Sequence, residues 1–467
     1  MKIITADMKV GDRPAAETIE ETYKQFTSRL ADFKKYSEYY EGRHEFKDRK
    51  GAKVTVNLVR YGIDNLVAYM AGIPPKYSFK EGDGAAGSIV ERYDRQNLKE
   101  KEAEIVRSLK IYGRAYELVY HDPEEDGHPP RSVFTSPECS YVVYDQRTDP
   151  DSVFGAIVRE IKQDKKKITV MDVYGPGWYQ EWRTDDSKKW TLSQPVKGGD
   201  TTRFTRVPLI EYLNSEDAMS EVENVISLQD ALNAVMSDRQ DDKDAFAGAM
   251  LLLYGTTLGL TKQEIKDNRE TLKDTKALHF ESRQQEGAEY LIKQMDEAGA
   301  QTYTDTITST IHKLMRVPDF SDEQFSSNSS GVAMAYKLYG THQAAKVTEQ
   351  YFGRGFRRRC KLYDDGLENA AQDAVRETSA DVSKMSIVFN YNVVVDPQAE
   401  AQAAQGYLAA GVSQETVLEN ISIVNDVGEE LKRLAKQKDE DLSREKQMMR
   451  DEFGNPPTAE KEVPVEE

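Results

Sequence analysis

The stretch VPDFSDEQFSSNSSGVAMAYKLYG, from Val317 to Gly340, places a polar loop between two helical patterns. Pro318 ends the helix expected over 297–316, because proline lacks the amide hydrogen that an α-helix requires. The loop that follows is rich in Ser and Asn, yet it also holds two large rings, Phe320 and Phe325. On the residues alone, these rings predict a surface loop anchored by a small local core.

Downstream of this loop the sequence is mainly helical. One helical pattern runs from 331 to about 375, and we expect Gly340, Gly353 and Gly355 to interrupt it, because glycine weakens helices. The other expected elements are a strand over 385–397, short helices over 398–411 and 413–421, a helix from Asp426 and a disordered tail over 441–467.

Upstream of the loop, two amphipathic helices flank a small α/β insert over 249–296. The first helix is expected from an N-cap at Asn214 or Ser215 to about Phe246, and the second over 297–316. Within the insert, the patterns predict strands over 250–255, 276–282 and 288–295 and a helix over 261–273. The apolar stripes of the two helices are Val222, Val225, Ile226, Leu232, Val235 and Met236, and Ile307, Ile311 and Leu314.

The first 213 residues combine helices with short strands. Helical periodicity covers about 15–40 and 88–112, and a period of two begins after Gly113. Turn-forming segments such as DPEEDG and QRTDPD separate the strands, which predicts one antiparallel meander. The fold class is therefore α+β and mainly helical.

Length and charge restrict the function. The chain has 467 residues, which predicts about two to four domains. Its net charge is −18, and this argues against tight nucleic-acid binding, which usually needs a basic surface. An acidic wall past which DNA slides without sticking is compatible with this charge. Cys139 and Cys360 are far apart, so no disulfide framework is expected, and neither a signal peptide nor a membrane span is predicted.

No motif carries catalysis, so we expect no enzyme, no metal and no cofactor. The P-loop pattern is absent, and the six histidines form no H-E-x-x-H pair. The acidic cluster Asp238–Asp244 is the strongest candidate, because a metal-dependent nuclease needs converging carboxylates. Arg239 and Lys243 are interleaved with these acids, which favours a solvated helix face. A metal-dependent nuclease and a monomeric acidic interaction scaffold remain the alternatives.

The segment RGFRRRCK is a dense basic run that contains Arg354, Arg357, Arg358 and Arg359. These side chains can contact DNA phosphates, or they can pair with acids of a neighbouring subunit. In a chain this acidic, pairing between subunits is the favoured interpretation.

Four blocks in order resemble the portal proteins of tailed bacteriophages, in the branch typical of long-tailed phages of Gram-positive hosts. They are YYEGRHEF at 39–46, NLVRYGIDNLVAYMAGIPPKY at 57–77, VPDFSDEQFSSNSSGVAMAYKL at 317–338 and AAGVSQETVLENI at 409–421. They are similar to the family's Tyr-x-Gly block, its helix ending in Gly-x-Pro, its tunnel-loop block and its crown block.

The resemblance implies a portal fold whose parts follow one another along the chain. They are a wing of helices and antiparallel meander over 1–213, a stem helix over 214–248, an α/β clip over 249–296, a second stem helix over 297–316, a tunnel loop over 317–330, a long helix returning to the wing over 331–380, an α-helical crown over 381–440 and a disordered tail over 441–467.

The tunnel loop would face the channel of a ring. The rings of Phe320 and Phe325 would anchor its base, and the polar residues 326–330 would form a mobile tip near DNA. The implied channel-facing residues are Asp319, Phe320, Asp322, Glu323, Gln324, Phe325, Ser326, Ser327, Asn328, Ser329 and Ser330.

The resemblance also implies the partners. The chain would form a homo-oligomeric ring, usually a dodecamer, at one capsid vertex of the virion, after assembly in the host cytoplasm. Double-stranded DNA would pass through the channel without sequence specificity during packaging and ejection. The protein partners would be the terminase, a head–tail adaptor, and the major capsid and scaffolding proteins, with no membrane involved.

Overall fold

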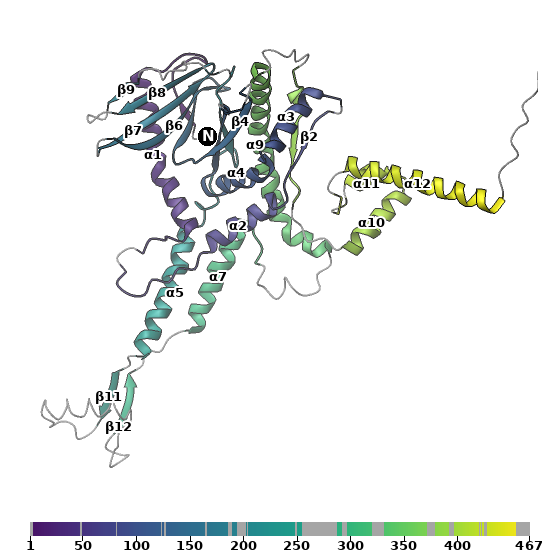
Figure 1. Cartoon of the computed structure of the whole chain (residues 1–467). Helices are drawn as coiled ribbons and strands as arrows, with labels where there is room; N and C mark the ends of the chain where they lie inside the picture. The colour runs from purple at the N-terminus through teal and green to yellow at the C-terminus, as the bar shows by residue number, and fades with distance from the viewer. Residues whose placement is uncertain are drawn as a thin grey trace, which may run out of the picture. The chain divides into compact units, whose positions relative to one another are not determined.

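In a computed structural model, the chain forms two compact units. The first consists of Met1–Ser327 and Tyr336–Asn392, and the second consists of Asn328–Ala335 and Val393–Glu467. Helices and sheets occur together, as the expected α+β class requires (Figure 1). The structure describes residues 3–453 apart from 47–48, 81, 123, 126–127, 164–165, 185–188, 194–201, 203, 248–249, 255–286, 292–296, 320–330, 371–378, 392–396, 420, 422 and 425–426. Among these residues, no helix combines the length and the apolar character needed to cross a bilayer.

A six-stranded sheet is the largest sheet of the first unit. Its strand order is β1-β5-β6-β7-β8-β9, with β1 parallel to β5 and the other pairs antiparallel. The strands are β1 (Ile4–Thr5), β5 (Ser140–Tyr144), β6 (Ser152–Gln163), β7 (Lys166–Gly175), β8 (Trp178–Thr184) and β9 (Trp190–Leu192).

Helix α1 (Ala16–Glu41) packs on this sheet through its apolar stripe. Ile19 and Phe26 are buried in one core with Tyr141 and Trp182. The ring of Phe26 stacks on that of Tyr141 with centroids 4.7 Å apart. Large aromatic side chains bury much apolar area, so this contact stabilises the helix on the sheet.

A second sheet corrects the prediction of one meander. Strand β3 (Arg114–His121) lies between β10 (Leu209–Leu213) and β4 (Pro130–Thr135) in a separate three-stranded sheet. The two sheets approach closely at Gly155, where an added Cβ would lie 2.4 Å from the Cβ of Leu209. Turn residues show where a strand ends, but they do not show which sheet the next strand joins.

Three further helices pack beside these sheets. They are α2 (Leu58–Ala71), α3 (Gly84–Arg95) and α4 (Leu98–Tyr112). The pattern over 88–112 is thus two helices, separated at Asn97, which has a left-handed φ of 52°. A short ribbon of β2 (Lys76–Ser78) and β13 (Ser386–Val388), with the 3₁₀ turn η1 (Val382–Lys384), completes the unit. Residues 381–391 thus belong to the first unit, which divides the expected crown over 381–440.

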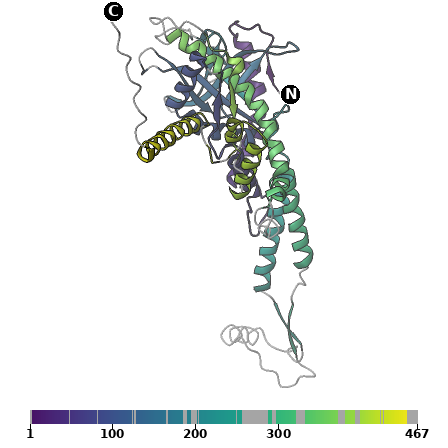
Figure 2. The same ribbon diagram turned by 90° about the vertical axis from the view of Figure 1, so that its right-hand side faces the viewer.

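Two long helices lie side by side and lead to a two-stranded ribbon (Figures 1 and 2). They are α5 (Ile226–Ala247) and α7 (Glu297–Met315), and the ribbon is β11 (Met250–Tyr254) paired antiparallel with β12 (Gly287–Leu291). The helix predicted over 261–273 and the strand over 276–282 lie outside the described residues.

Helix α5 begins at Ile226, twelve residues after the predicted N-cap at Asn214. Asn214 is buried, and its side-chain oxygen accepts hydrogen bonds from Lys110 Nζ and Thr348 Oγ1, each at 2.9 Å. The Asn214 side chain therefore serves as a hydrogen-bond acceptor for the buried Lys110 and not as an N-cap, because a buried ammonium group needs acceptors. Val222 and Val225 are buried in the turns that precede the helix.

Helix α9 (Gly331–Ala370) is continuous, so the predicted interruptions at Gly340, Gly353 and Gly355 are wrong. Gly355 instead allows close packing, because a Cβ there would lie 2.4 Å from Cδ1 of Tyr212. The small helical penalty of glycine is outweighed by the burial of the surrounding side chains.

The second unit contains α10 (Pro397–Ala409), α11 (Gln414–Glu419) and α12 (Val427–Phe453). Helix α12 continues to Phe453, past residue 441, where the disordered tail was expected to begin. Its acids and bases are good helix formers, and pairs such as Arg433 with Glu430 lie one turn apart.

Candidate functional site

One face of α5 carries a polar ladder, which we call the α5 ladder: Gln229, Asn233, Ser237 and Asp241, each four residues after the last. These side chains accept hydrogen bonds from the backbone amides of Leu58 (3.2 Å), Val56 (3.0 Å), Val54 (2.9 Å) and Ala52 (2.7 Å), in that order. Four helical residues advance about 6 Å and two extended residues about 6.6 Å, so the two segments stay in register.

The end of α1 joins the α5 ladder through the block YYEGRHEF. Gly42 closes α1 with a left-handed φ of 82°, a conformation that favours glycine. His44 is buried, with Nε2 2.9 Å from the carbonyl of Tyr39 and Nδ1 2.7 Å from Nδ2 of Asn233. The Tyr39 hydroxyl donates to Asp230 at 2.6 Å. This block therefore fixes the base of α5 to the sheet-bearing part of the unit.

The acidic cluster Asp238–Asp244 is partly engaged by the chain itself. Arg49 binds Asp238 at 2.8 Å and Asp241 at 2.5 Å. The backbone amide of Ala52 and then Arg49 hold the pKa of Asp241 below its ordinary value. Within the described part of the chain, no three His, Cys, Asp or Glu residues are grouped so that they could hold a metal ion. The geometry of these acids is that of a structural contact.

The apolar residues predicted on the two long helices differ in burial. Leu232, Ile307 and Ile311 are buried, whereas Ile226, Val235 and Met236 are half-buried. Leu314 is 43% exposed, and Met315 takes the buried position beside it. The side chain of Met315 reaches Gly62 of α2, where an added Cβ would lie 2.4 Å from its Sδ.

The polar loop after α7 is described only at its start. Residues 320–330, which include ten of the predicted channel-facing residues and both rings, lie outside the described residues. Asp319 Oδ2 lies 3.9 Å from Nε2 of His312, whose Nδ1 is 3.1 Å from the carbonyl of Val317. The hydroxyl of Thr341 on α9 donates to the carbonyl of Arg316. These contacts fix the point where the loop leaves α7.

Arg359 is 1% exposed and bridges two buried carboxylates, which corrects its predicted role at a subunit or DNA surface. It pairs with Glu102 of α4, and its Nε lies 2.8 Å from Glu117 of β3. Tyr212 and Tyr77 donate hydroxyls to Glu117 and Glu102, at 2.6 Å and 3.0 Å. Burial acts to lower the pKa of Arg359, but the two carboxylates outweigh burial and raise it well above its usual value. Arg359 therefore links α9 to α4 and β3.

The other three arginines of the basic run line a cavity of about 610 Å³. Arg354 and Arg357 are exposed on α9, while Arg358 is mostly buried and donates a hydrogen bond to Ser152 Oγ. The structure thus brings Arg354, Arg357 and Arg358 together and separates Arg359 from them.

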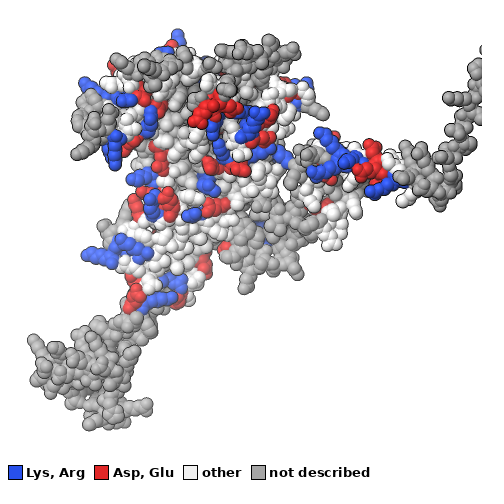
Figure 3. Space-filling view, viewed as in Figure 1, with Lys and Arg blue, Asp and Glu red and all other residues white. Residues whose placement is uncertain are grey.

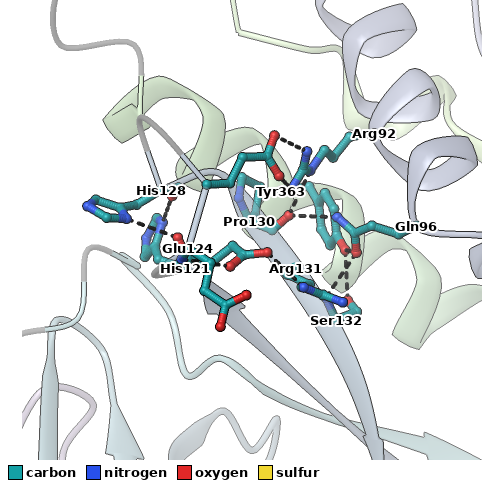
Figure 4. Close-up of polar contacts among 11 residues, drawn as sticks. Arg92, Gln96, His121, Glu124, His128, Pro130, Arg131, Ser132 and Tyr363 are labelled. Carbon is teal, nitrogen blue, oxygen red and sulfur yellow. Dashed lines mark hydrogen bonds and ion pairs between the residues drawn. The ribbon is translucent and has the colours of Figure 1, made fainter.

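A polar network that the motifs did not indicate ties α3 and α9 to β4 (Figure 4). Arg92 and Gln96 donate to the carbonyl of Pro130 at 3.2 Å and 2.8 Å. The Tyr363 hydroxyl lies 2.8 Å from Gln96 Oε1 and 3.0 Å from Ser132 Oγ. No sequence motif indicates the residues of this network. The α5 ladder is different, because its four-residue spacing is visible in the sequence as a polar periodicity.

Comparisons with known proteins give one family. The family model described as "Phage portal protein, SPP1 Gp6-like" matches residues 19–444. Among solved structures, the chain is similar to a chain from the virion of a native gene transfer agent particle, with 10% sequence identity and a TM-score of 0.41. That match covers 82% of this chain and 89% of the other. No curated protein sequence matches this chain.

Proposed function

The chain belongs to the SPP1 Gp6-like family of phage portal proteins, and we propose from this membership that it forms a ring at a single capsid vertex. The ring, of about twelve copies by the resemblance, would be the channel for DNA packaging and ejection. The family is structural, so the channel moves DNA only when an external ATPase drives it. The observation that carries the proposal is the extent of the match, from α1 in the first unit to α12 in the second.

In this proposal α5 and α7 form the stem, whose exposed apolar residues meet neighbouring copies. Helix α7 buries Ile307, Ile311 and Met315 within the chain but leaves Tyr303 52% and Leu314 43% exposed. Exposed apolar groups that follow a helix commonly mark a surface covered in an assembly. A ring supplies that cover on every copy.

The polar loop over 317–330 would face the channel. Its sequence carries Asp319, Asp322 and Glu323, and phosphate is repelled by such acids. Repulsion avoids deep binding minima along the DNA, so the duplex can pass without sequence-specific contacts.

The remaining partners follow from the order of the parts. The clip, which contains β11 and β12, would contact the terminase during packaging and a head–tail adaptor afterwards. The helices α10, α11 and α12 would form the crown. The ring would be built into the virion with the major capsid and scaffolding proteins, after assembly in the host cytoplasm.

Native mass with negative-stain imaging of the full-length protein tests the ring. We expect a closed particle about twelve times the 53.0 kDa chain, with a central hole wide enough for a DNA duplex. A monomer, both alone and after co-expression with the capsid and scaffolding proteins, would contradict the proposal and favour the monomeric acidic scaffold.

The nuclease alternative has less support, because Asp238 and Asp241, two of the carboxylates it would use, form ion pairs with Arg49. Metal-dependent DNA cleavage that is lost on Asp241→Ala would favour it. If the purified protein does not cleave duplex DNA with Mg²⁺ or Mn²⁺, the nuclease alternative fails.

A further inference from the structure

A cavity beside α9 concentrates positive charge in an acidic protein. Among the described residues, its lining consists of five cations, one carboxylate and neutral residues: the cations are Arg206, Arg354, Arg357, Arg358 and Lys361, and the carboxylate is Asp151. Over the face seen in Figure 3, Lys and Arg lie among Asp and Glu. The chain carries a net charge of −18, so this local excess of cations is the opposite of the average.

The helical period explains how α9 supplies four of these cations. Positions 354, 357, 358 and 361 are separated by three, one and three residues, which places them on one face of the helix. That face is opposed by the segments around 151–152 and 205–207, which contribute to the lining. Val10 and Pro176 also line the cavity, which is therefore built from five separate stretches of one folded chain.

Arg358 is the most deeply placed of these cations. Its guanidinium donates to Ser152 Oγ, but its Nε is buried and has no hydrogen-bond partner among the described residues. Burial lowers the pKa of Arg358 and outweighs Tyr144 and Asp151, which act to raise it, and the positive charge of Arg206 adds to the lowering. A buried N–H without an acceptor is costly, and structures usually supply an acceptor for such a group.

We propose that this cavity binds a phosphate group, either of a free phosphate or pyrophosphate or of the DNA backbone. Five cations facing one carboxylate call for a multivalent anion. The oxygens of a phosphate group can accept from several arginine forks at once, whereas one carboxylate offers two oxygens and one charge. The cavity lies within a single chain, so the inference stands whether or not the ring proposal holds.

Isothermal titration of the full-length protein at low salt tests the site with three probes: inorganic phosphate, inorganic pyrophosphate and a short DNA duplex. The test variant is Arg354→Gln with Arg357→Gln, because both side chains are exposed at the cavity and Gln keeps the helix. The matched control is Arg95→Gln with Arg107→Gln, which removes two exposed arginines from α3 and α4. Thermal melts of both variants check that they remain folded.

We expect the wild type and the control to bind at least one probe equally, and the test variant to bind about tenfold more weakly or worse. For the duplex, the slope of log K against log salt should fall by about 2 in the test variant. Binding of phosphate or pyrophosphate alone identifies a free anion as the source, and binding of the duplex alone identifies the DNA backbone.

Three results would overturn the proposal. In the first, the wild type binds none of the probes. In the second, the test and control variants bind a probe more weakly than the wild type by the same factor. In the third, the test variant binds as tightly as the wild type. Suppose that the wild type binds no anion and that the test variant differs from it only in oligomer mass. The cavity would then be assigned to an acidic segment of a second copy instead.

Discussion

At the scale of single residues, two neighbouring arginines of one basic run, Arg358 and Arg359, lie in different environments. Phe352, Phe356, Cys360 and Tyr363 are buried, at the spacing of an apolar helix stripe. Arg359 follows that stripe, while Arg358 is rotated by about 100° toward the cavity. The apolar stripe can be read from the sequence. The burial of Arg359 beside it could not be predicted, because an arginine is rarely buried unless carboxylates pair with it.

Arg359→Met should destabilise the first unit by about 3–5 kcal/mol, because it leaves Glu102 and Glu117 buried without their cation. The three tryptophans, Trp178, Trp182 and Trp190, all lie in the six-stranded sheet, so their fluorescence during urea unfolding reports on this unit.

The control for this variant is Arg95→Met, an exposed arginine, which should change the free energy of unfolding by about 0.5 kcal/mol or less. Adding Glu102→Gln and Glu117→Gln to Arg359→Met should restore part of the stability. If Arg359→Met alone is as stable as the wild type, the buried ion cluster does not have the role assigned to it.

At the scale of elements, the long helices could be predicted from periodicity and the sheets could not. Helices α1 and α7 end within a residue of the expected positions, because a Gly and a Pro follow their apolar patterns. The start of α5 was misplaced, because Asn214 and Ser215 suit an N-cap but Asn214 binds Lys110 instead. Local signals could not reveal that long-range partner.

The α5 ladder makes a prediction for Asn233. Asn233→Ala should cost about 1–3 kcal/mol, because the half-buried amide of Val56 loses its acceptor, the buried side chain of Asn233. Hydrogen exchange of residues 52–58 should rise, while exchange in the six-stranded sheet should not. Ala234→Ser, at the next and exposed position of α5, is the control and should leave both unchanged. Unaltered protection of residues 52–58 in Asn233→Ala would argue against the ladder.

Two glycines of α9 form a matched pair. Gly355→Ala should destabilise the unit by about 1–3 kcal/mol, because its Cβ would overlap the Tyr212 ring. Gly353→Ala should stabilise it by up to about 1 kcal/mol, because its nearest neighbour is the flexible Arg357 at 3.6 Å. Urea unfolding of both variants measures the difference. Equal effects would show that the ring of Tyr212 can move away.

At the scale of the whole molecule, the order of the blocks indicated the family before any geometry was known. The sequence did not indicate that the strands form two sheets or that residues 381–391 join the first unit, because strand pairing depends on distant segments. Of the proposed site, the exposed arginines were found from the sequence, whereas the cavity they line needed the fold.

Leu314→Glu should leave the single chain folded but weaken its assembly, because the side chain is 43% exposed before any partner binds. Ser309→Glu, exposed on another face of α7, is the control. Native mass and melting temperature of both variants separate assembly from folding. If Leu314→Glu assembles like the wild type, this face of α7 is not between copies.

Deletion of Ser326–Ser330 should leave assembly intact and impair DNA packaging, because the stretch contains no core-forming residue. Packaged DNA per particle, compared with ring formation of the same variant, measures the effect. Loss of the ring would show that the loop is structural and that its proposed place on the channel axis is wrong.

The register of the α5 ladder restricts how the length of this helix can change. One residue inserted between Gln229 and Asp241 would turn every later rung by about 100° away from the segment it holds. The same insertion after Asp241 would leave all four rungs in place. Lengthening is therefore tolerated only in the part of α5 near β11, so that end can be extended to suit another partner while the base remains fixed.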